Sequence, residues 1–201
     1  MASRRSEVED PDAFNPLPVK IIIAGGFGVG KTTFVGAISE IEPLFTEAAL
    51  TEVSRGVDDV SNTEDKTTTT VALDFGRIGL EDSLLLYLFG TPGQDRFAFL
   101  WDDLVSGALG AIVLLDTRRI EDCFPTVDYF EERNTPMLLA VNQFERAPSF
   151  ELDEVREALG VGPHVPIVRC DARVRDSVKQ VLVALIEQVL AGQLEAAAAG
   201  R

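Results

Sequence analysis

The sequence predicts an α/β fold with a six-stranded, mostly parallel sheet, helices on both faces and one antiparallel strand. Short apolar runs alternate with longer segments of helical character along most of the 201 residues, as in a chain of strand–helix units. A glycine-rich turn follows the first apolar run directly. Residues 80–82 form a short link between two strand-like runs, which predicts a hairpin in an otherwise parallel sheet.

Six segments have the character of strands. The segment Val19–Ala24 (VKIIIA) is nearly continuously apolar, as expected of a strand buried on both faces. Residues 69–79 alternate polar and apolar side chains at period two, which indicates a half-buried strand. The other four are short apolar runs at residues 83–89, 108–116, 136–142 and 165–170.

Helices are expected between these strands. The first begins at Lys31 after the glycine turn and ends near residue 41, before Pro43. The last, from Arg175 to about Leu194, carries its apolar residues on one face. Further helices are expected at residues 97–106, 120–132 and 152–159. Residues 45–66 show no period and predict a long irregular loop, which is usually a functional feature.

Charge and composition exclude several classes of function. The formal net charge of -15 repels phosphate backbones and anionic lipids, so neither nucleic-acid binding nor a direct membrane anchor is expected. The two cysteines, Cys123 and Cys170, and the single His164 lack metal-ligand spacing. They are typical of a cytosolic protein with buried thiols.

The chain is expected to contain one domain. Residues 1–17 are polar and form a flexible N-terminal segment, residues 18–194 form the domain, and residues 195–201 form a frayed tail. The sequence shows no signal peptide or lipidation motif. No apolar run reaches the ~20 residues that span a bilayer. A cytoplasmic protein that reaches membranes only through a partner is therefore expected.

One motif carries most of the chemistry. Residues 25–32, GGFGVGKT, match the phosphate-binding pattern G-x-x-x-x-G-K-[ST] between a strand and a helix. Glycines let successive N–H groups point at phosphates, and the helix N-terminus favours negative charge. Lys31 is expected on the β- and γ-phosphates, Thr32 on Mg²⁺ and Thr33 near the α-phosphate. The predicted phosphate-binding residues are Gly25, Gly26, Phe27, Gly28, Val29, Gly30, Lys31, Thr32 and Thr33.

With this motif the chain resembles the Ras-like small GTPases, and it is most similar to those of actinobacterial conservons, which are related to the Mgl-type bacterial GTPases. The resemblance lies in AGGFGVGKTTFVGA, DKTTTTVALDFGRI, LFGTPGQDRF and DTRRIEDCFPTVDYF. It implies GTP and GDP as ligands, Mg²⁺ as cofactor, and two protein partners, a Roadblock/LC7-type regulator and a sensor-kinase-like protein.

The resemblance also implies two switch loops. Thr70 would close over Mg²⁺ and the γ-phosphate, although Thr67 to Thr69 leave its register open and an ordinary threonine-rich edge strand is the alternative. Gly93 would offer its N–H to the γ-phosphate. Gln94 would orient the attacking water, so that Gln94 and Lys31 are the predicted catalytic residues. The alternative for this second segment is a turn before a helix.

Two late loops would read the base. Asn142-Gln143-Phe144-Glu145 stands where the family carries N-K-x-D, and Asp171-Ala172-Arg173 stands where it carries S-A-K. By resemblance, Asn142 contacts the base and tethers the phosphate loop, Glu145 accepts hydrogen bonds from guanine, and Ala172 donates its N–H to the guanine O6. The predicted base-binding residues are Asn142, Gln143, Glu145, Asp171, Ala172 and Arg173.

Four positions depart from the family pattern. Gly90 replaces the aspartate that holds Mg²⁺ through water, and Asp116 is either its substitute or a strand-ending cap. Phe27 is bulky where the family has a small residue, so it either crowds an arginine arriving from a partner or packs harmlessly. Glu145 and Gln143 replace an aspartate and a lysine, which softens guanine preference. Arg55 is either an arginine finger in cis or a solvated loop residue.

These observations favour a GTP-binding switch with slow hydrolysis. Two alternatives remain open. One is a nucleotide-binding scaffold with negligible hydrolysis, suggested by Phe27 and Gly90. The other is an ATP-dependent P-loop enzyme, although no arginine-rich lid or acceptor-binding segment is visible in the sequence.

Overall fold

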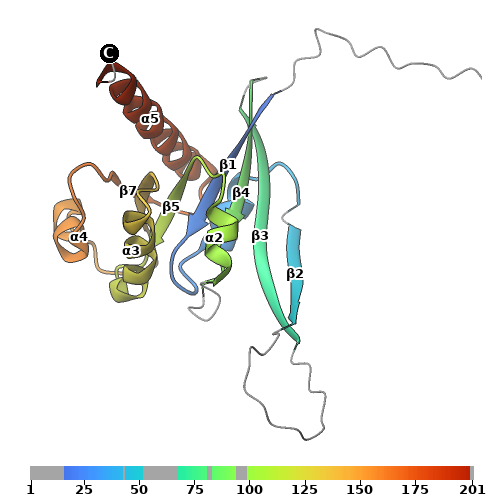
Figure 1. Ribbon diagram of the computed structural model, residues 1–201. Helices are drawn as coiled ribbons and strands as arrows, with labels where there is room; N and C mark the ends of the chain where they lie inside the picture. The colour runs from blue at the N-terminus through green and yellow to red at the C-terminus, as the bar shows by residue number, and fades with distance from the viewer. Residues whose placement is uncertain (1–15, 43, 52–67, 81–82, 94–98, 200–201) are drawn as a thin grey trace, which may run out of the picture.

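The computed structural model describes residues 16–42, 44–51, 68–80, 83–93 and 99–199 (Figure 1). Its centre is a seven-stranded sheet in the order β2-β3-β4-β1-β5-β6-β7. The strands are β1 (Leu17–Ala24), β2 (Leu44–Thr51), β3 (Thr68–Leu80), β4 (Leu84–Gly90), β5 (Gly110–Leu115), β6 (Met137–Asn142) and β7 (Ile167–Cys170). The predicted fold class is confirmed, with one strand more than expected.

Only β3 runs against the other strands. It pairs antiparallel with β2 on one side and with β4 on the other, while β1, β4, β5, β6 and β7 are mutually parallel. The register Leu80↔Leu84 joins β3 to β4 and confirms the hairpin predicted at residues 80–82. The parallel strands have alternating or fully buried side chains, and β5 and β6 are buried at every residue, as strands covered on both faces require.

The additional strand is β2, where an irregular loop was expected. Its eight residues pair with β3 from Leu44↔Phe75 to Thr51↔Thr68. The expectation for residues 45–51 was wrong because an edge strand need not show a clean apolar period when backbone pairing to its neighbour supplies its hydrogen bonds. The remainder of the expected loop, residues 52–67, lies outside the described residues.

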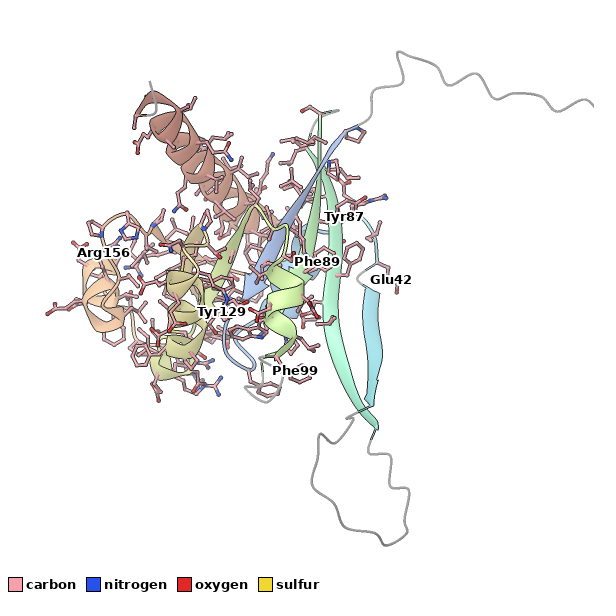
Figure 2. The ribbon with its side chains drawn as sticks, in the orientation of Figure 1. Glu42, Tyr87, Phe89, Phe99, Tyr129 and Arg156 are labelled. Atoms are coloured by element: carbon pink, nitrogen blue, oxygen red, sulfur yellow. The ribbon has the colours of Figure 1, made fainter. Side chains whose placement is uncertain are left out.

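Helices cover both faces of the sheet (Figure 1 and Figure 2). They are α1 (Lys31–Ile38), α2 (Trp101–Val105), η2 (Ile120–Cys123), α3 (Phe124–Glu132), α4 (Leu152–Leu159) and α5 (Arg175–Ala199). One core forms between the sheet and helices α1 and α5, and a second forms between the opposite face and η2, α3 and α4. Pro125 is tolerated because it stands in the first turn of α3, where its missing N–H has no intrahelical partner.

Helix α5 continues to Ala199, so residues 195–199, expected to be a frayed tail, are helical. Its first part packs into the core through Val178, Val181, Leu182, Leu185 and Val189. By length and composition alone, α5 would also qualify as a membrane-spanning helix. A long core helix passes the same test, so the composition of α5 is weak evidence for a membrane span.

The order of the strands determines where the functional loops meet. From β1 the chain moves outward to β2 and β3, returns through β4, and then crosses β1 to begin β5. The strand order therefore reverses at β1. In open α/β sheets, ligands bind beyond the carboxyl ends of the strands at such a reversal. The loops after β1, β4, β6 and β7, which hold most of the predicted site, lie at this edge.

Candidate functional site

The loop after β1 has the backbone that a phosphate cradle needs. Gly25 and Gly30 have φ of 130° and 105°, in the left-handed region that favours glycine. A Cβ at Gly25 would lie 2.4 Å from the Leu114 carbonyl oxygen, and one at Gly30 would lie 2.7 Å from Asn142 Nδ2. Both glycines are therefore required by close approaches. The loop ends at the N-terminus of α1, which begins at Lys31.

Lys31 points back into this loop. Its side chain is buried, and Nζ donates hydrogen bonds to the carbonyl oxygens of Gly25 and Gly26 at 2.7 and 2.8 Å. Burial lowers the pKa of Lys31 to about 8, while the charge of Asp74 opposes that shift. Gly93 lies against the Lys31 amine, because a Cβ at position 93 would lie 2.7 Å from Lys31 Nζ. Lys31 and Gly93 are thus brought together at this loop.

Asp74 was not included among the predicted metal-binding residues. The Thr32 hydroxyl donates to its carboxylate oxygens at 2.8 and 3.0 Å. Asp74 stands directly opposite Gly90 in the antiparallel register of β3 and β4. A Cβ at Gly90 would lie 2.8 Å from Asp74 Cβ and 2.9 Å from Oδ2. The Asp74 side chain therefore fills the space into which an aspartate at position 90 would project.

Asp116 does not substitute for the missing aspartate. Its carboxylate accepts hydrogen bonds from the backbone N–H, Nε and Nη2 of Arg118 at 3.0, 2.8 and 2.7 Å. These bonds, led by those from the Arg118 side chain, lower the pKa of Asp116. Arg118 also lies over the ring of Phe144, with its guanidinium carbon 3.9 Å from the ring centroid. Asp116 thus caps the end of β5, the alternative considered from sequence.

Asn142, at the end of β6, links the phosphate loop to the loop after β7. It is buried at the end of β6. Its Nδ2 donates to the Val29 carbonyl oxygen at 2.8 Å, and its Oδ1 accepts from the Ala172 N–H at 3.0 Å. The predicted tether from Asn142 to the phosphate loop is therefore present in the structure. One buried amide holds three segments that are far apart in the sequence.

In the loop after β7, the N–H of Ala172 has a different partner from the one expected. Its N–H, expected to face a base, is paired with Asn142. The neighbouring Asp171 and Arg173 N–H groups are also paired, with Ser177 Oγ at 2.9 Å and with Asp171 Oδ1 at 3.0 Å. Each backbone donor of residues 171–173 thus has a partner within the protein, so the donation of Ala172 to a base oxygen requires a shift or a shared hydrogen bond.

The carboxylate of Glu145 faces solvent. Its side chain is 88% exposed, and Oε1 lies 3.9 Å from Arg173 Nη1. Arg173 is held by Asp171 through Nε and Nη2, each at 2.9 Å. Because the Glu145 pair is long and exposed, it contributes little stability and leaves the carboxylate available. Gln143 is exposed beside it.

Some predicted residues have no described side chain. Thr70 lies in β3 opposite Ala49, and its role remains a prediction. Gln94 and Arg55 lie outside the described residues. Phe27 is 65% exposed, although its Cα meets Gly93 closely. Asp74 could not be predicted as a site residue, because it reaches Gly90 through the pairing of β3 with β4. The one signal in the sequence is that Asp74 lies in the strand before β4, which has Gly90 where the family has aspartate.

The comparisons with known proteins agree with this fold. A family model described as "Conserved hypothetical ATP binding protein" matches residues 23–192. "Uncharacterized protein MJ1339" of Methanocaldococcus jannaschii is 31% identical over 101 residues, half of this chain and 53% of that protein. The chain thus spans about half the length of this relative. The Ras-related protein SEC4 of Saccharomyces cerevisiae is 24% identical over 177 residues, 85% of this chain and 74% of that protein.

Solved structures match over a similar extent. The G domain of the T. maritima FeoB iron transporter matches with a TM-score of 0.59 at 18% identity, covering 85% of this chain and 98% of that one. The FeoB G domain from Methanococcus jannaschii matches with a TM-score of 0.58 at 16% identity, covering 86% and 98%. At these identities the likeness shows the fold, which is that of a P-loop G domain. Because the family model covers most of the chain, this protein belongs to the family of conserved hypothetical ATP-binding proteins.

Proposed function

We propose that this protein is a GTP-binding molecular switch that hydrolyses GTP slowly to GDP. The observation that carries the proposal is Asn142, whose buried amide joins the phosphate loop at Val29 to the loop at Ala172. A nucleotide spanning these loops would have its phosphates and its base positioned by one rigid connection. This arrangement supports the resemblance to Ras-like GTPases.

The residues around Thr32 fit a magnesium ion. A threonine hydroxyl and the carboxylate of Asp74 converge within 3.0 Å, and Mg²⁺ prefers oxygen ligands of this kind. In this proposal Thr32 and Thr70 would hold the ion, and Asp74 would help to hold it through water, in place of an aspartate at position 90. When bound, Mg²⁺ neutralises phosphate charge during hydrolysis.

The protein's own groups would perform the remaining steps. The backbone N–H groups of residues 26–33 and the Lys31 ammonium bind the phosphates. Gly93 donates to the γ-phosphate, and Gln94 orients the water. The Thr70 and Gly93 loops would be ordered by the γ-phosphate and released after hydrolysis, which is the switch.

Recognition of guanine would rest on Glu145. Its exposed carboxylate suits the two donors on one edge of guanine, a pair that adenine lacks there. The paired N–H groups of residues 171–173 weaken the second base contact, so the preference for guanine is softer than in relatives with aspartate. The family description names ATP, and this observation favours ATP binding as the second candidate function.

The cellular role follows from the motif resemblance alone. In this proposal the protein acts in bacterial signalling, like the conservon-encoded and Mgl-type GTPases that it resembles. A Roadblock/LC7-type regulator and a sensor-kinase-like protein would be its partners. It would work in the cytoplasm and reach the membrane through a partner.

Competition binding tests the proposed function. Fluorescently labelled GDP bound to the protein is displaced with GTP, GDP, ATP and ADP, each with Mg²⁺ and with EDTA. Displacement by guanine nucleotides at lower concentrations than adenine nucleotides is expected. Tighter binding of ATP would overturn the guanine assignment. Single-turnover reactions with GTP and Mg²⁺ then separate a slow GTPase from a scaffold, because a scaffold releases no phosphate.

A further inference from the structure

A second positively charged side chain contacts the phosphate loop. Arg119 Nη2 donates a hydrogen bond to the Phe27 carbonyl oxygen at 3.0 Å. The same nitrogen lies 3.7 Å from the place that a Cβ at Gly28 would occupy. A turn after β5, closed by the Arg119 N–H on the Asp116 carbonyl oxygen at 2.9 Å, sets this position. The guanidinium therefore lies against the peptide that joins Phe27 to Gly28.

Among the residues that the structure describes, Arg119 forms no short ion pair. The nearest carboxylate oxygens among them belong to Asp122 at 3.4 Å and Asp116 at 3.8 Å, and the Arg119 side chain is 46% exposed. Arg118 instead holds Asp116 with two short hydrogen bonds. Long, half-exposed ion pairs contribute little, whereas arginine binds phosphate with a strong, bidentate geometry. Arg119 can therefore bind a phosphate at this loop while losing only weak interactions with Asp122 and Asp116.

The geometry also places Arg119 near the γ-phosphate end of the loop. A Cβ at Gly93 would lie 2.7 Å from Lys31 Nζ and 2.9 Å from Phe27 Cα. Gly93, Lys31 and Phe27 therefore meet at one end of the cradle, the end that the proposed function gives to the γ-phosphate. Arg119 is bonded to the carbonyl of the same Phe27.

The bulky side chain of Phe27 favours an arginine from the same chain over one from a partner protein. The Phe27 side chain is 65% exposed, and a bulky ring at this position of the loop would obstruct an arginine arriving from a partner protein. An arginine that is already part of the chain does not need that route. It also supplies positive charge beside the phosphates in a protein whose net charge is -15.

We propose that Arg119 is a catalytic arginine in cis, which stabilises the charge that develops on the γ-phosphoryl group during hydrolysis. This inference rests on the proposed GTPase function. Water attacks the γ-phosphorus, the bond to the β–γ bridging oxygen breaks, and that oxygen leaves with its electron pair on GDP. The water proton is released with inorganic phosphate. The guanidinium leaves the Phe27 carbonyl for the phosphate oxygens and stays protonated throughout.

Single-turnover GTP hydrolysis with Arg119→Ala, Arg119→Lys and wild-type protein tests this role. The matched control is Lys179→Ala, which removes one exposed positive charge from α5. Arg119→Ala should lower the rate at least about tenfold, because an arginine at the transition state contributes orders of magnitude to the rate. Its GDP affinity should change less than about threefold, and Arg119→Lys should recover part of the rate. Lys179→Ala should match the wild type.

Binding of aluminium fluoride gives a readout that is independent of turnover. The wild type with GDP, Mg²⁺ and aluminium fluoride should form a transition-state complex without a partner, and Arg119→Ala should bind GDP yet fail to form it. Equal hydrolysis rates in Arg119→Ala and the wild type would overturn the inference and leave the proposed function standing. So would a rate loss matched by an equal loss of GDP affinity. A wild type that binds GTP without hydrolysing it, or fails to bind it, would overturn both.

Discussion

Replacing Asp74 with asparagine should uncouple nucleotide binding from Mg²⁺. The carboxylate accepts the Thr32 hydroxyl at 2.8 and 3.0 Å and would hold a water of the metal. A hydrogen bond to a charged group contributes about 1.5–3 kcal/mol, which corresponds to roughly 10- to 100-fold in affinity. The gain in GDP affinity that Mg²⁺ provides should therefore shrink by about that factor in Asp74→Asn.

Affinity for GDP without metal should behave differently. Asp74→Asn removes a negative charge near Lys31 and therefore near the phosphates, so GDP affinity in EDTA should stay the same or increase. Titrations of labelled GDP at fixed Mg²⁺ concentrations and in EDTA measure both quantities. Asp153→Asn, on the exposed surface of α4, is the matched control for charge. An unchanged response to Mg²⁺ in Asp74→Asn would refute the assignment.

Moving the carboxylate from position 74 in β3 to position 90 in β4 tests the same assignment in a second way. A Cβ at position 90 would lie 2.8 Å from Asp74 Cβ, so Gly90→Asp alone should destabilise the fold through a clash and like-charge repulsion. Combined with Asp74→Gly, the same substitution places a carboxylate in the vacated space. The double variant should recover much of the Mg²⁺ dependence that Asp74→Gly loses. Failure of that recovery in a folded double variant would contradict the idea that the two positions share one role.

Other predictions concern the amine, the tether and the base. The pKa of Lys31 is about 8, and bound phosphates would raise it, so GDP binding takes up a proton above pH 8. The affinity for GDP should therefore be steady below pH 8 and fall as the pH rises above it. Titrations across pH 6.5–9.5 would show this profile. Asn142→Ala leaves the buried Ala172 N–H unpaired, so it should lower the free energy of unfolding by about 1–3 kcal/mol in urea melts and weaken GDP binding strongly. Glu145→Asp should raise the ratio of guanine to adenine affinity, whereas Glu145→Ala should lower it; equal ratios in all three proteins would contradict base reading by this residue.

The sequence identified the features that depend on local chemistry. The phosphate loop, with its required glycines and the buried Lys31, lies where the motif indicates. The tether from Asn142 to the phosphate loop, which the resemblance to Ras-like GTPases implies, is present as a hydrogen bond to Val29. The antiparallel direction of β3 followed from the short link at residues 80–82.

Features that depend on pairing between distant segments could not be predicted in this way. β2 is a strand because β3 offers it a free edge, which its own residues do not reveal. Strand register brings Asp74 opposite Gly90, and Arg119 reaches the phosphate loop from the end of β5, the strand beside β1. The sequence analysis predicts a frayed tail after residue 194, whereas α5 continues to Ala199, because alanine has the highest intrinsic helix propensity.

GDP binding by Lys31→Ala is the decisive test of nucleotide binding at the phosphate loop. Lys31 Nζ lies inside this loop between the carbonyls of Gly25 and Gly26, and in the proposed function it binds the phosphates. Calorimetric titration of this variant and of the wild type with GDP and Mg²⁺, with circular dichroism confirming the fold, should show binding only in the wild type. Equal affinity in a folded Lys31→Ala variant would show that nucleotide does not bind at this loop and would contradict the account.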